Sequence, residues 1–317
     1  MSKVAIIGDT HFSPKTPVSR KDDYPNTLLK KLNSLFTLCL DKGVTDCIFL
    51  GDLINCNQMT VEYLIKLYDG LLRFKQAGIS LHTLIGNHDL PHGNKEYLEN
   101  SAISLLLRTV FDQKDFILGD TIFVLENYYM TVDNLKGVET ENISTKIFCG
   151  HYFYLNGFND TAHTLSPELC KELGYNMYFL GHDHTPYEPL KVNGYEVHRP
   201  GSFSRATSDT CQVTRDNIQI CLYDVATCKV EYVDIPNVLP SKDVYKEAKL
   251  IEKMTVSNID TTLSEDIDNL IDSMSFDFSS DIYTVLDSLN INEEVKDKVT
   301  EYLTEEGLFR KWVKICY

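Results

Sequence analysis

Five short apolar segments of this chain each end in glycine followed by polar side chains, and this recurrence restricts the fold more than any other feature. Helical patterns separate the first three segments, which predicts a βαβαβ unit and therefore a largely parallel core sheet. Ligand sites of such sheets lie beyond the carboxyl ends of the strands. We therefore expect one crevice to collect the five polar ends, which are Gly8-Asp9-Thr10-His11, Gly51-Asp52-Leu53-Ile54-Asn55, Gly86-Asn87-His88-Asp89, Gly150-His151 and Gly181-His182-Asp183-His184.

The periodicity of apolar residues predicts where the elements lie. The βαβαβ unit has strands at Lys3–Gly8, Cys47–Gly51 and Ile79–Ile85, with a helix in each interval. The later elements are a helix over residues 96–110, antiparallel strands over 116–132 with a turn at Gly119-Asp120, buried strands at Lys146–Cys149 and Met177–Leu180, a short helix at Pro167–Leu173, and paired strands over 186–198 and 217–235.

Pro236 and Pro240 mark a boundary, after which the pattern becomes helical. We predict a catalytic domain over residues 1–237 and a helical capping or partner-binding region over residues 238–317. A capping-box pattern at Thr262 and Glu265 indicates where the first helix of that region begins.

The residue types at the strand ends are suited to binding metal ions. Glycine lets the backbone turn sharply beside a bound ion. Each motif alone is also compatible with an ordinary turn or cap, but five in order at strand ends indicate a metal site. Seven ligands of mixed hardness favour Mn²⁺, Zn²⁺ or Fe²⁺ over Mg²⁺ alone; they are Asp9, His11, Asp52, Asn87, His151, His182 and His184.

The order GDxH, GDxxN, GNHD, GH and GHxH resembles the calcineurin-like metallophosphoesterase superfamily, over residues 3 to about 235. The resemblance implies an α/β fold, a four-layer α/β/β/α sandwich, with the helical C-terminal region as a small appendage. It also implies two divalent metal ions, for which we expect Mn²⁺, with Zn²⁺, Fe²⁺ and Mg²⁺ as alternatives. Carried over by position, Asp9, His11 and His184 would hold one ion. Asn87, His151 and His182 would hold the other, and Asp52 would bridge the two.

The resemblance further implies attack of hydroxide on phosphorus, with His88 as the general acid. Histidine suits this role because it titrates near physiological pH. Many phosphatase relatives have an aspartate where this chain has Asn55, which can orient His88 by a hydrogen bond. Asp89 is the other candidate for that task, and its alternative role is to cap the turn.

The superfamily hydrolyses protein phosphates, nucleotides and nucleic acids, so the metal motifs leave the substrate open. The stretch Val197–Arg205 resembles the "PGS…R" segment of SbcD-type DNA repair nucleases, and the phosphatase pattern GDxVDRG is absent. This favours a phosphodiesterase acting on DNA, the exonuclease or endonuclease subunit of an SbcCD-like recombination and repair complex from a phage or a bacterium. The alternatives are a nucleotide or cyclic-nucleotide phosphodiesterase or phosphatase, and a non-catalytic scaffold, which usually loses several ligands.

The net charge of −16 disfavours a free-standing nucleic-acid binder, because neutralising phosphates supplies most of the affinity. Half of this charge lies in residues 238–317. The expected partners are DNA and an SMC-like ATPase of the SbcC type, which must supply any ATP-driven step because this chain has no GxxxxGK[ST] loop. A homodimer is a further alternative. Candidate phosphate contacts are Lys15, Arg20, Lys21, Arg199 and Arg205; the first three have solvation of a surface loop as the alternative.

Three features bear on location. No apolar run is long enough to span a bilayer, and Met1-Ser2-Lys3 lacks the form of a signal peptide. The nine cysteines contain no CxxC pair, which indicates reduced thiols. We expect a cytoplasmic protein without membrane association, in the host cytoplasm if a phage encodes it.

The last residues combine apolar and basic side chains, and they either pack on their own domain or bind the ATPase. Deleting residues 308–317 is expected to abolish co-purification with the ATPase subunit. Thermal unfolding of the catalytic domain should remain unchanged. A folded variant that still binds the ATPase would contradict the partner-binding interpretation.

Overall fold

Two β-sheets form the centre of the part that the structure, a computed structural model, describes: residues 2–155, 161–192 and 194–247. These residues belong to the first of two compact units, Met1–Asn258. The first sheet has the order β13 (Lys229–Asp234), β12 (Gln219–Asp224), β1 (Lys3–Ile7), β2 (Asp46–Phe49) and β3 (Ser80–Thr83). The second has the order β10 (Tyr187–Val192), β11 (Tyr195–Arg199), β9 (Met177–Gly181), β6 (Thr145–His151), β5 (Thr121–Glu126) and β4 (Phe116–Leu118).

The predicted βαβαβ unit is confirmed. Strands β1, β2 and β3 are parallel and in sequential order, and helices α1 (Tyr24–Lys42) and α2 (Val61–Gln76) connect them. In the second sheet β5, β6, β9 and β11 are parallel to their neighbours, while β4 and β10 pair antiparallel at its two edges. The strand ends that carry the polar motifs therefore come from both sheets.

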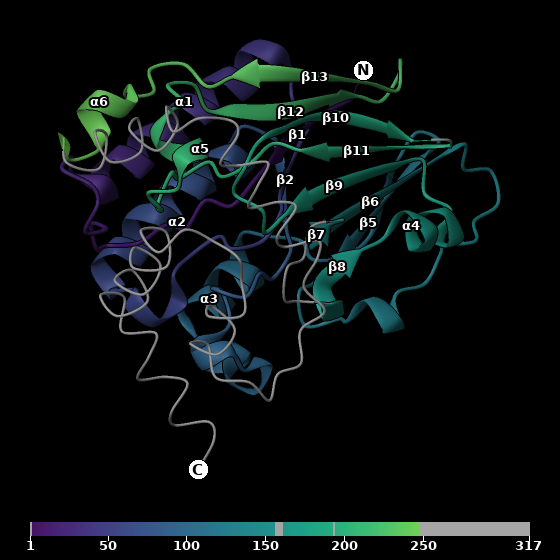
Figure 1. The fold of residues 1–317 in the computed structure, drawn as a ribbon, viewed down its shortest axis with the longest axis horizontal. Helices are drawn as coiled ribbons and strands as arrows, with labels where there is room; N and C mark the ends of the chain where they lie inside the picture. Colours follow the sequence, from purple (N-terminus) through teal and green to yellow (C-terminus); the bar gives the residue numbers. More distant parts are fainter. Residues whose placement is uncertain (1, 156–160, 193, 248–317) are drawn as a thin grey trace, which may run out of the picture. The chain divides into compact units, whose positions relative to one another are not determined.

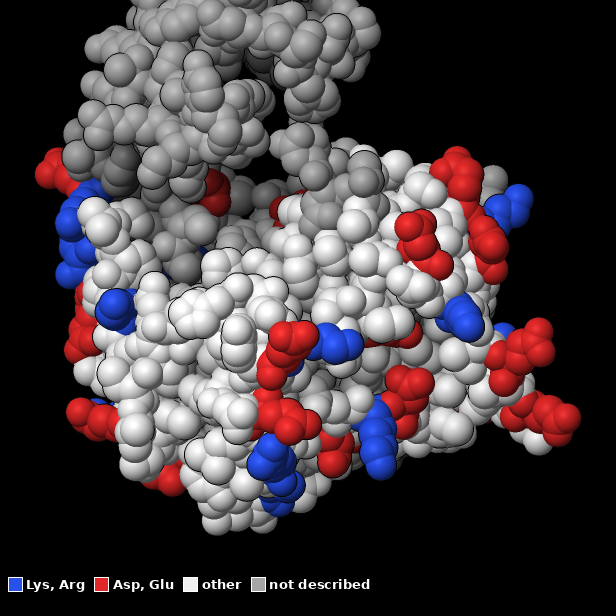
Figure 2. Space-filling view, turned by 90° about the horizontal axis from the view of Figure 1, so that it is seen from below, with Lys and Arg blue, Asp and Glu red and all other residues white. Residues whose placement is uncertain are grey.

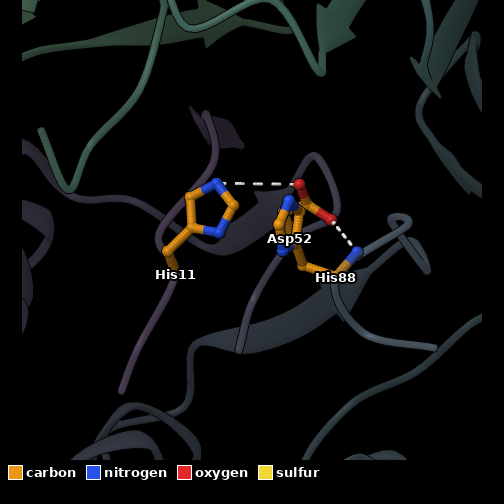
Figure 3. Close-up of side chains that lie close together, drawn as sticks. All are labelled: His11, Asp52 and His88. Carbon is orange, nitrogen blue, oxygen red and sulfur yellow. Dashed lines mark hydrogen bonds and ion pairs between the residues drawn. The ribbon is translucent and has the colours of Figure 1, made fainter. Parts of the chain in front are cut away.

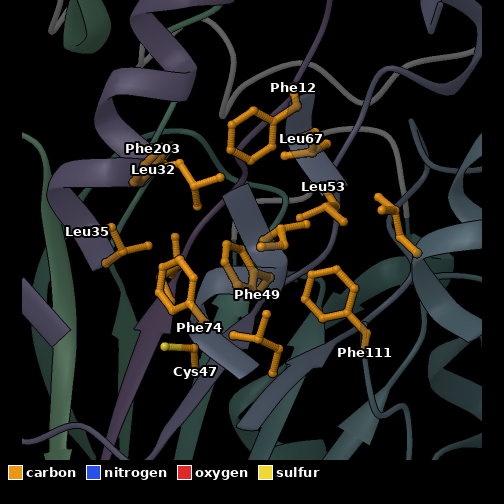
Figure 4. Packing of buried hydrophobic residues seen from close by; sticks show 14 of the residues in the cluster. Phe12, Leu32, Leu35, Cys47, Phe49, Leu53, Leu67, Phe74, Phe111 and Phe203 are labelled. Carbon is orange, nitrogen blue, oxygen red and sulfur yellow. The ribbon is translucent and has the colours of Figure 1, made fainter. Parts of the chain in front are cut away.

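Alternating side chains on the strands build three layers of apolar packing. Val4 and Ile6 of β1 face the second sheet and pack with Phe123 and Ile147. The intervening residues of β1 and β2 face the helices, where Cys47 and Phe49 pack with Leu32, Leu35 and Leu67 (Figure 4). On the far face of the second sheet, Phe148 and Tyr178 pack with Cys170 and Leu173 of α4 (Pro167–Leu173).

These three layers produce the expected α/β/β/α sandwich. Figure 1 shows α1, α2 and α3 (Ala102–Thr109) on one side of the strands and α4 on the other. The four-layer fold class is thus confirmed for the described residues.

Local sequence signals account for the helix limits. The Asp23 side chain accepts a hydrogen bond from the Asn26 backbone N–H at the start of α1, and Gly43 ends that helix with a φ of 67°. Thr60 caps α2 in the same way. Ser166 and Pro167 begin α4, and Gly174 ends it at a φ of 70°.

Two predicted elements differ from the structure. Residues 96–110 form a 3₁₀ helix at Lys95–Asn100 and then α3, because Ser101 between them has an extended backbone. The turn at Gly119-Asp120 joins β4 to β5 as predicted, but β5 ends at Glu126. Because β5 is parallel to β6, the residues after Glu126 lie at the same sheet edge as the polar motifs.

The remaining elements are short. Paired strands were predicted over 186–198 and 217–235, and they form the hairpins β10–β11 and β12–β13, one in each sheet. The others are 3₁₀ turns at Cys56–Gln58, Pro91–Gly93, Val132–Asn134 and Thr161–His163, the small sheet of β7 (Phe153–Tyr154) and β8 (Thr164–Leu165), and the helices α5 (Thr210–Val213) and α6 (Ser241–Val244).

The helices predicted beyond residue 262 lie outside the described residues. Residues 241–245 still belong to the first unit, where Tyr245 is fully buried and its hydroxyl donates to the Arg205 carbonyl. The division at residue 237 therefore stays a prediction. A search of the described helices finds none with the length and apolar character needed to cross a membrane.

The layer between the sheets provides a test of the fold. Replacing Ile48 of β2, which is fully buried there, with alanine is expected to destabilise the protein by about 2–5 kcal/mol through cavity formation. Urea denaturation measures the loss. Ile65→Ala on α2 is the matched control, because 54% of Ile65 is exposed, and a change within about 0.5 kcal/mol is expected. Equal losses for the two variants would contradict the assigned packing.

Candidate metal centre

Strained backbone at the strand ends brings the predicted ligands together. His11, Asp52 and His182 have φ values of 43°, 47° and 83°, in the left-handed region that residues other than glycine rarely adopt. Such positions cost about 1–3 kcal/mol each and are found where function requires them. Close backbone approach adds a second constraint, because a Cβ on Gly86 would overlap the Asp52 backbone nitrogen.

The first group of side chains surrounds His11. Its Nε2 atom lies 2.9 Å from Nε2 of His184 and 3.6 Å from Oδ2 of Asp52. The His182 backbone N–H donates to both oxygens of the Asp9 carboxylate, at 3.0 and 3.2 Å. Figure 3 shows the Asp52 carboxylate joined to the His11 ring through one oxygen and to the His88 backbone nitrogen through the other.

The second group surrounds His151, which is fully buried. Its Nε2 atom lies 3.1 Å from Oδ1 of Asn87 and 3.4 Å from Oδ2 of Asp52. Possible ligand atoms of Asp52, His151 and His182 all lie within 4.8 Å of one another. The same oxygen of Asp52 therefore faces both groups, as expected of a bridging ligand. All seven residues predicted as ligands gather here, although ligand roles remain a proposal.

The hydrogen bonds of His151 suit cation binding. Its Nδ1 atom lies 2.7 Å from the Leu50 carbonyl oxygen, which can only accept, so Nδ1 carries the proton. Metal-binding histidines commonly donate one ring N–H to such a carbonyl, which leaves the other nitrogen free for the metal. Here Nε2 faces the acceptor oxygens of Asn87 and Asp52. Buried acceptors that face each other require a positive charge between them.

The pKa values of the histidines indicate the same need for positive charge between the buried acceptors. Burial alone would lower the pKa of His151, but the neighbouring Asp52 carboxylate outweighs it and raises this pKa to about 9. A second proton on His151 thus supplies positive charge in the absence of a cation. Burial lowers the pKa of His11 to about 3, which keeps its ring in the neutral form that binds metals.

The two carboxylates differ in their pKa shifts. Burial raises the pKa of Asp9, and it would also raise that of Asp52. The positive charge of the surrounding histidines, His151 first, instead lowers the pKa of Asp52 well below its ordinary value. Asp52 is therefore ionised between the two groups. Once cations take the place of the second proton on His151, the ionised carboxylate, the neutral imidazoles and an amide oxygen are a donor set that fits two divalent cations.

The predicted catalytic residues occupy distinct positions. His88 is exposed, and its backbone N–H donates to Asp52 Oδ1 at 2.8 Å. Asn55 Oδ1 lies 3.1 Å from Nδ1 of His11. The buried Asp89 carboxylate accepts backbone N–H groups from Leu53, Ile54 and Gly86, and burial raises its pKa to about 7.

These bonds give Asn55 and Asp89 partners other than the one predicted. Among the described residues, the side-chain hydrogen bonds of Asn55 and Asp89 go to these partners and not to the His88 ring. Asn55 orients His11 instead. Asp89 ties the end of β3 to the loop after β2, which is the turn-capping alternative.

Of the residues predicted to contact phosphate, the lysines are exposed and the arginines are buried. Lys15 and Lys21 are exposed. Arg20 is buried, pairs with Asp22 at 2.7 Å and donates to the carbonyls of Ser204 and Arg205. The Arg205 guanidinium is also buried and donates to backbone carbonyls and to the Ser241 hydroxyl. Neither arginine is available to a phosphate in this arrangement.

Arg199 is mostly buried as well. Its guanidinium carbon lies 3.6 Å from the centre of the Tyr187 ring, over which it stacks. This cation–π contact accounts for the position of Arg199 without a phosphate.

Sequence reasoning missed a bracing network behind Asp9 and His184. The Asp9 carbonyl accepts hydrogen bonds from the Ser202 hydroxyl and from the backbone N–H groups of Phe203 and Ser204. The His184 carbonyl accepts from the Gln212 side chain at 2.5 Å and from the Ser202 backbone N–H at 3.0 Å. The "PGS" stretch was recognised only as a resemblance, and nothing in the pattern pointed to Gln212.

Aromatic residues beside His182 were also missed. The ring centres of Tyr128 and Phe153 lie 5.3 and 4.1 Å from that of His182. Tyr128 follows β5, so a parallel assignment of β5 would have placed it at this edge.

Comparison with known proteins identifies the class to which this site belongs. Residues 2–186 match the family of calcineurin-like phosphoesterases, and the chain therefore belongs to that family. The chain is a phosphoester hydrolase, and the family uses a dimetal centre.

Particular proteins are similar over longer stretches. Exonuclease subunit 1 of Enterobacteria phage T4 is 24% identical over 332 residues, which cover 96% of this chain and 88% of that protein. Among solved structures, the anchor in the inner membrane complex of Plasmodium has a TM-score of 0.47 at 13% identity, covering 80% of this chain and 93% of that one. A dimetal phosphatase from Danio rerio has a TM-score of 0.46 at 12% identity, covering 74% and 98%.

The contact between Gly86 and Asp52 leads to a prediction about metal affinity. In Gly86→Ala the new Cβ must displace Asp52, so Mn²⁺ affinity measured by calorimetry is expected to fall about 10–100-fold, as for changes in residues that orient ligands. Gly78→Ala is the control. Its Cβ meets nothing within 4 Å, and its φ of 82° leads us to expect lower stability with unchanged Mn²⁺ affinity. Equal Mn²⁺ affinity in both variants would count against the assigned site.

Proposed function

We propose that this phosphoester hydrolase is a metal-dependent phosphodiesterase acting on DNA, the exonuclease or endonuclease subunit of an SbcCD-like recombination and repair complex. The observation that carries the proposal is the similarity to exonuclease subunit 1 of phage T4. It extends over nearly the whole chain, well beyond residues 2–186 of the family match. The word subunit in that name also favours a partner.

We assign the seven gathered side chains as ligands of two divalent cations, Mn²⁺ first. Asp9, His11 and His184 would hold one ion, Asn87, His151 and His182 would hold the other, and Asp52 would lie between them. The acceptor atoms that converge at 2.9–3.6 Å support this assignment. When bound, such cations activate water and stabilise the charge that develops on the phosphoryl oxygens.

His88 is proposed as the general acid. Its ring is exposed and lies 4.9 Å from the His11 ring, so it can reach the oxygen of a phosphoester placed at the centre. The bond from its backbone to Asp52 fixes its position relative to the bridging carboxylate. Asn55 acts by orienting His11, and Asp89 acts by holding the two loops that carry Asp52 and His88.

The charge distribution favours a DNA-binding partner. On the face shown in Figure 2, acidic and basic side chains are interspersed. With a net charge of −16, much of the affinity for DNA would have to come from another chain. We propose an SMC-like ATPase of the SbcC type, bound through residues 238–317, with Lys15 and Lys21 as additional phosphate contacts. The complex would act in the cytoplasm.

The second candidate function is hydrolysis of nucleotides or cyclic nucleotides. It is favoured by the same set of ligands, which serves many phosphoesters. A non-catalytic scaffold is disfavoured, because the seven ligands and His88 are all present and gathered.

A substrate panel tests the proposal. With Mn²⁺ and the ATPase partner, linear duplex DNA is expected to be cleaved in preference to small nucleotides and bis(p-nitrophenyl) phosphate. His88→Asn should retain Mn²⁺ binding and lose about 10²–10⁴-fold in kcat, the usual contribution of a general acid. His92→Asn is the matched control, since His92 is also exposed and its φ of 52° suits asparagine.

Two results would overturn these assignments. Cleavage of small esters without action on DNA, even with the partner present, would favour the second candidate. A His88→Asn variant as active as the unmodified protein would exclude the acid role.

A further inference from the structure

The loop after β5 holds an aromatic residue in a fixed position at the edge of the metal centre. The Tyr128 backbone N–H donates to the Ile85 carbonyl at 2.8 Å, and the Asn127 side chain accepts from the Ile85 N–H at 2.7 Å. The buried Tyr152 also holds this loop, because its hydroxyl donates to the carbonyls of Asn127 and Met130. The position of Tyr128 is therefore set by both sheets.

Tyr128, Phe153 and His163, here called the aromatic cluster, lie side by side. The Tyr128 and His163 rings stack with centres 3.9 Å apart and an angle of 15° between their planes. Phe153 contacts the His182 ring at 4.1 Å between centres, and Tyr128 contacts it at 5.3 Å. All three members are only partly buried.

The cluster lies against the His182 ring. Phe153 and Tyr128 contact that ring directly, whereas His163 stacks face to face on Tyr128, and its ring centre lies 6.1 Å from that of Tyr152. The assigned ligand His182 stands directly beside the cluster. A substrate whose phosphate is held at the centre can therefore place its next chemical group over the cluster.

In a nucleic acid the group next to the phosphate is a nucleoside. Stacking of a base on aromatic side chains contributes about 5- to 150-fold in affinity for each base, and it tolerates any sequence because every base has a π face. Paired bases in a duplex have their faces covered by neighbouring bases. An aromatic surface of this kind is therefore suited to an unpaired base.

We propose that the aromatic cluster is a stacking subsite for an unpaired nucleobase adjacent to the scissile phosphate. This inference rests on the proposed action on nucleic acid, and it goes further by naming a strand end or single strand as the form bound at the centre. Tyr128 supplies the main stacking surface, and His163 stacks on one face of its ring.

Two oligonucleotides test the subsite, both single-stranded and with one cleavable linkage flanked by phosphorothioates. One carries bases on the nucleosides next to that linkage, and the other is abasic there. For the base-bearing substrate, Tyr128→Leu is expected to raise KM about tenfold or more, the lower part of the range for base stacking. The abasic substrate should change less than about twofold, because it makes no stacking contact to lose.

Controls separate stacking from packing. Tyr128→Phe keeps the ring and should behave as the unmodified protein. Tyr68→Leu on α2 removes a partly buried tyrosine elsewhere and should affect neither substrate. Mn²⁺ affinity, measured by calorimetry, should be the same in all variants. Equal losses on both substrates, or a loss explained by weaker Mn²⁺ binding, would reduce Tyr128 to a packing role and overturn the proposal.

Binding of fully phosphorothioate versions separates the subsite from the proposed function. If the unmodified protein binds the base-bearing strand no more tightly than the abasic strand, the stacking subsite is wrong whatever the activity. If it binds the base-bearing strand more tightly but cleaves neither natural oligonucleotide, the proposed nuclease function is wrong and the subsite stands.

Discussion

The contact of Asp52 with histidines from both sheets is the interaction on which the site depends. Asp52 follows β2 of the first sheet, His151 ends β6 of the second, and one carboxylate oxygen of Asp52 faces both His11 and His151. Burying this carboxylate is unfavourable unless positive charge is nearby. The apolar layer between the sheets fixes the position of one sheet relative to the other. The packing of Val4, Ile6 and Ile147 therefore also positions the charged side chains of the site.

The sequence predicted the parts of the molecule that follow from local pattern. Strand ends marked by glycine and polar residues gave the ligand set, and capping residues such as Asp23 and Ser166 gave helix limits. The resemblance supplied the pairing of the two sheets, which no local periodicity encodes. Residues whose role depends on tertiary contacts were not accessible in this way. Arg20 and Arg205 are basic in the sequence, yet their guanidinium groups bind backbone carbonyls inside the fold.

The same limit explains the residues that were missed. The sequence pattern predicts antiparallel pairing for the strand before Tyr128, and only the parallel pairing of β5 with β6 places Tyr128 at the metal centre. Gln212 bonds the His184 carbonyl from a four-residue helix with no distinguishing pattern. The sequence pattern assigns Asn55 to His88 and leaves Asp89 between His88 and the turn, because contact with His11 or with backbone N–H groups depends on how the loops fold back.

The bracing of Asp9 has a consequence for how the protein is made. The Asp9 carbonyl is held by donors from residues 202–204, and His184 stands 175 positions after Asp9 in the chain. Contacts so distant in sequence form late, because the intervening chain must first be ordered. On the ribosome the first three strands can pair as they emerge, but the centre stays incomplete until residues 182–204 have been translated. A nascent chain of this design is thus kept from hydrolysing phosphoesters until most of it has been synthesised.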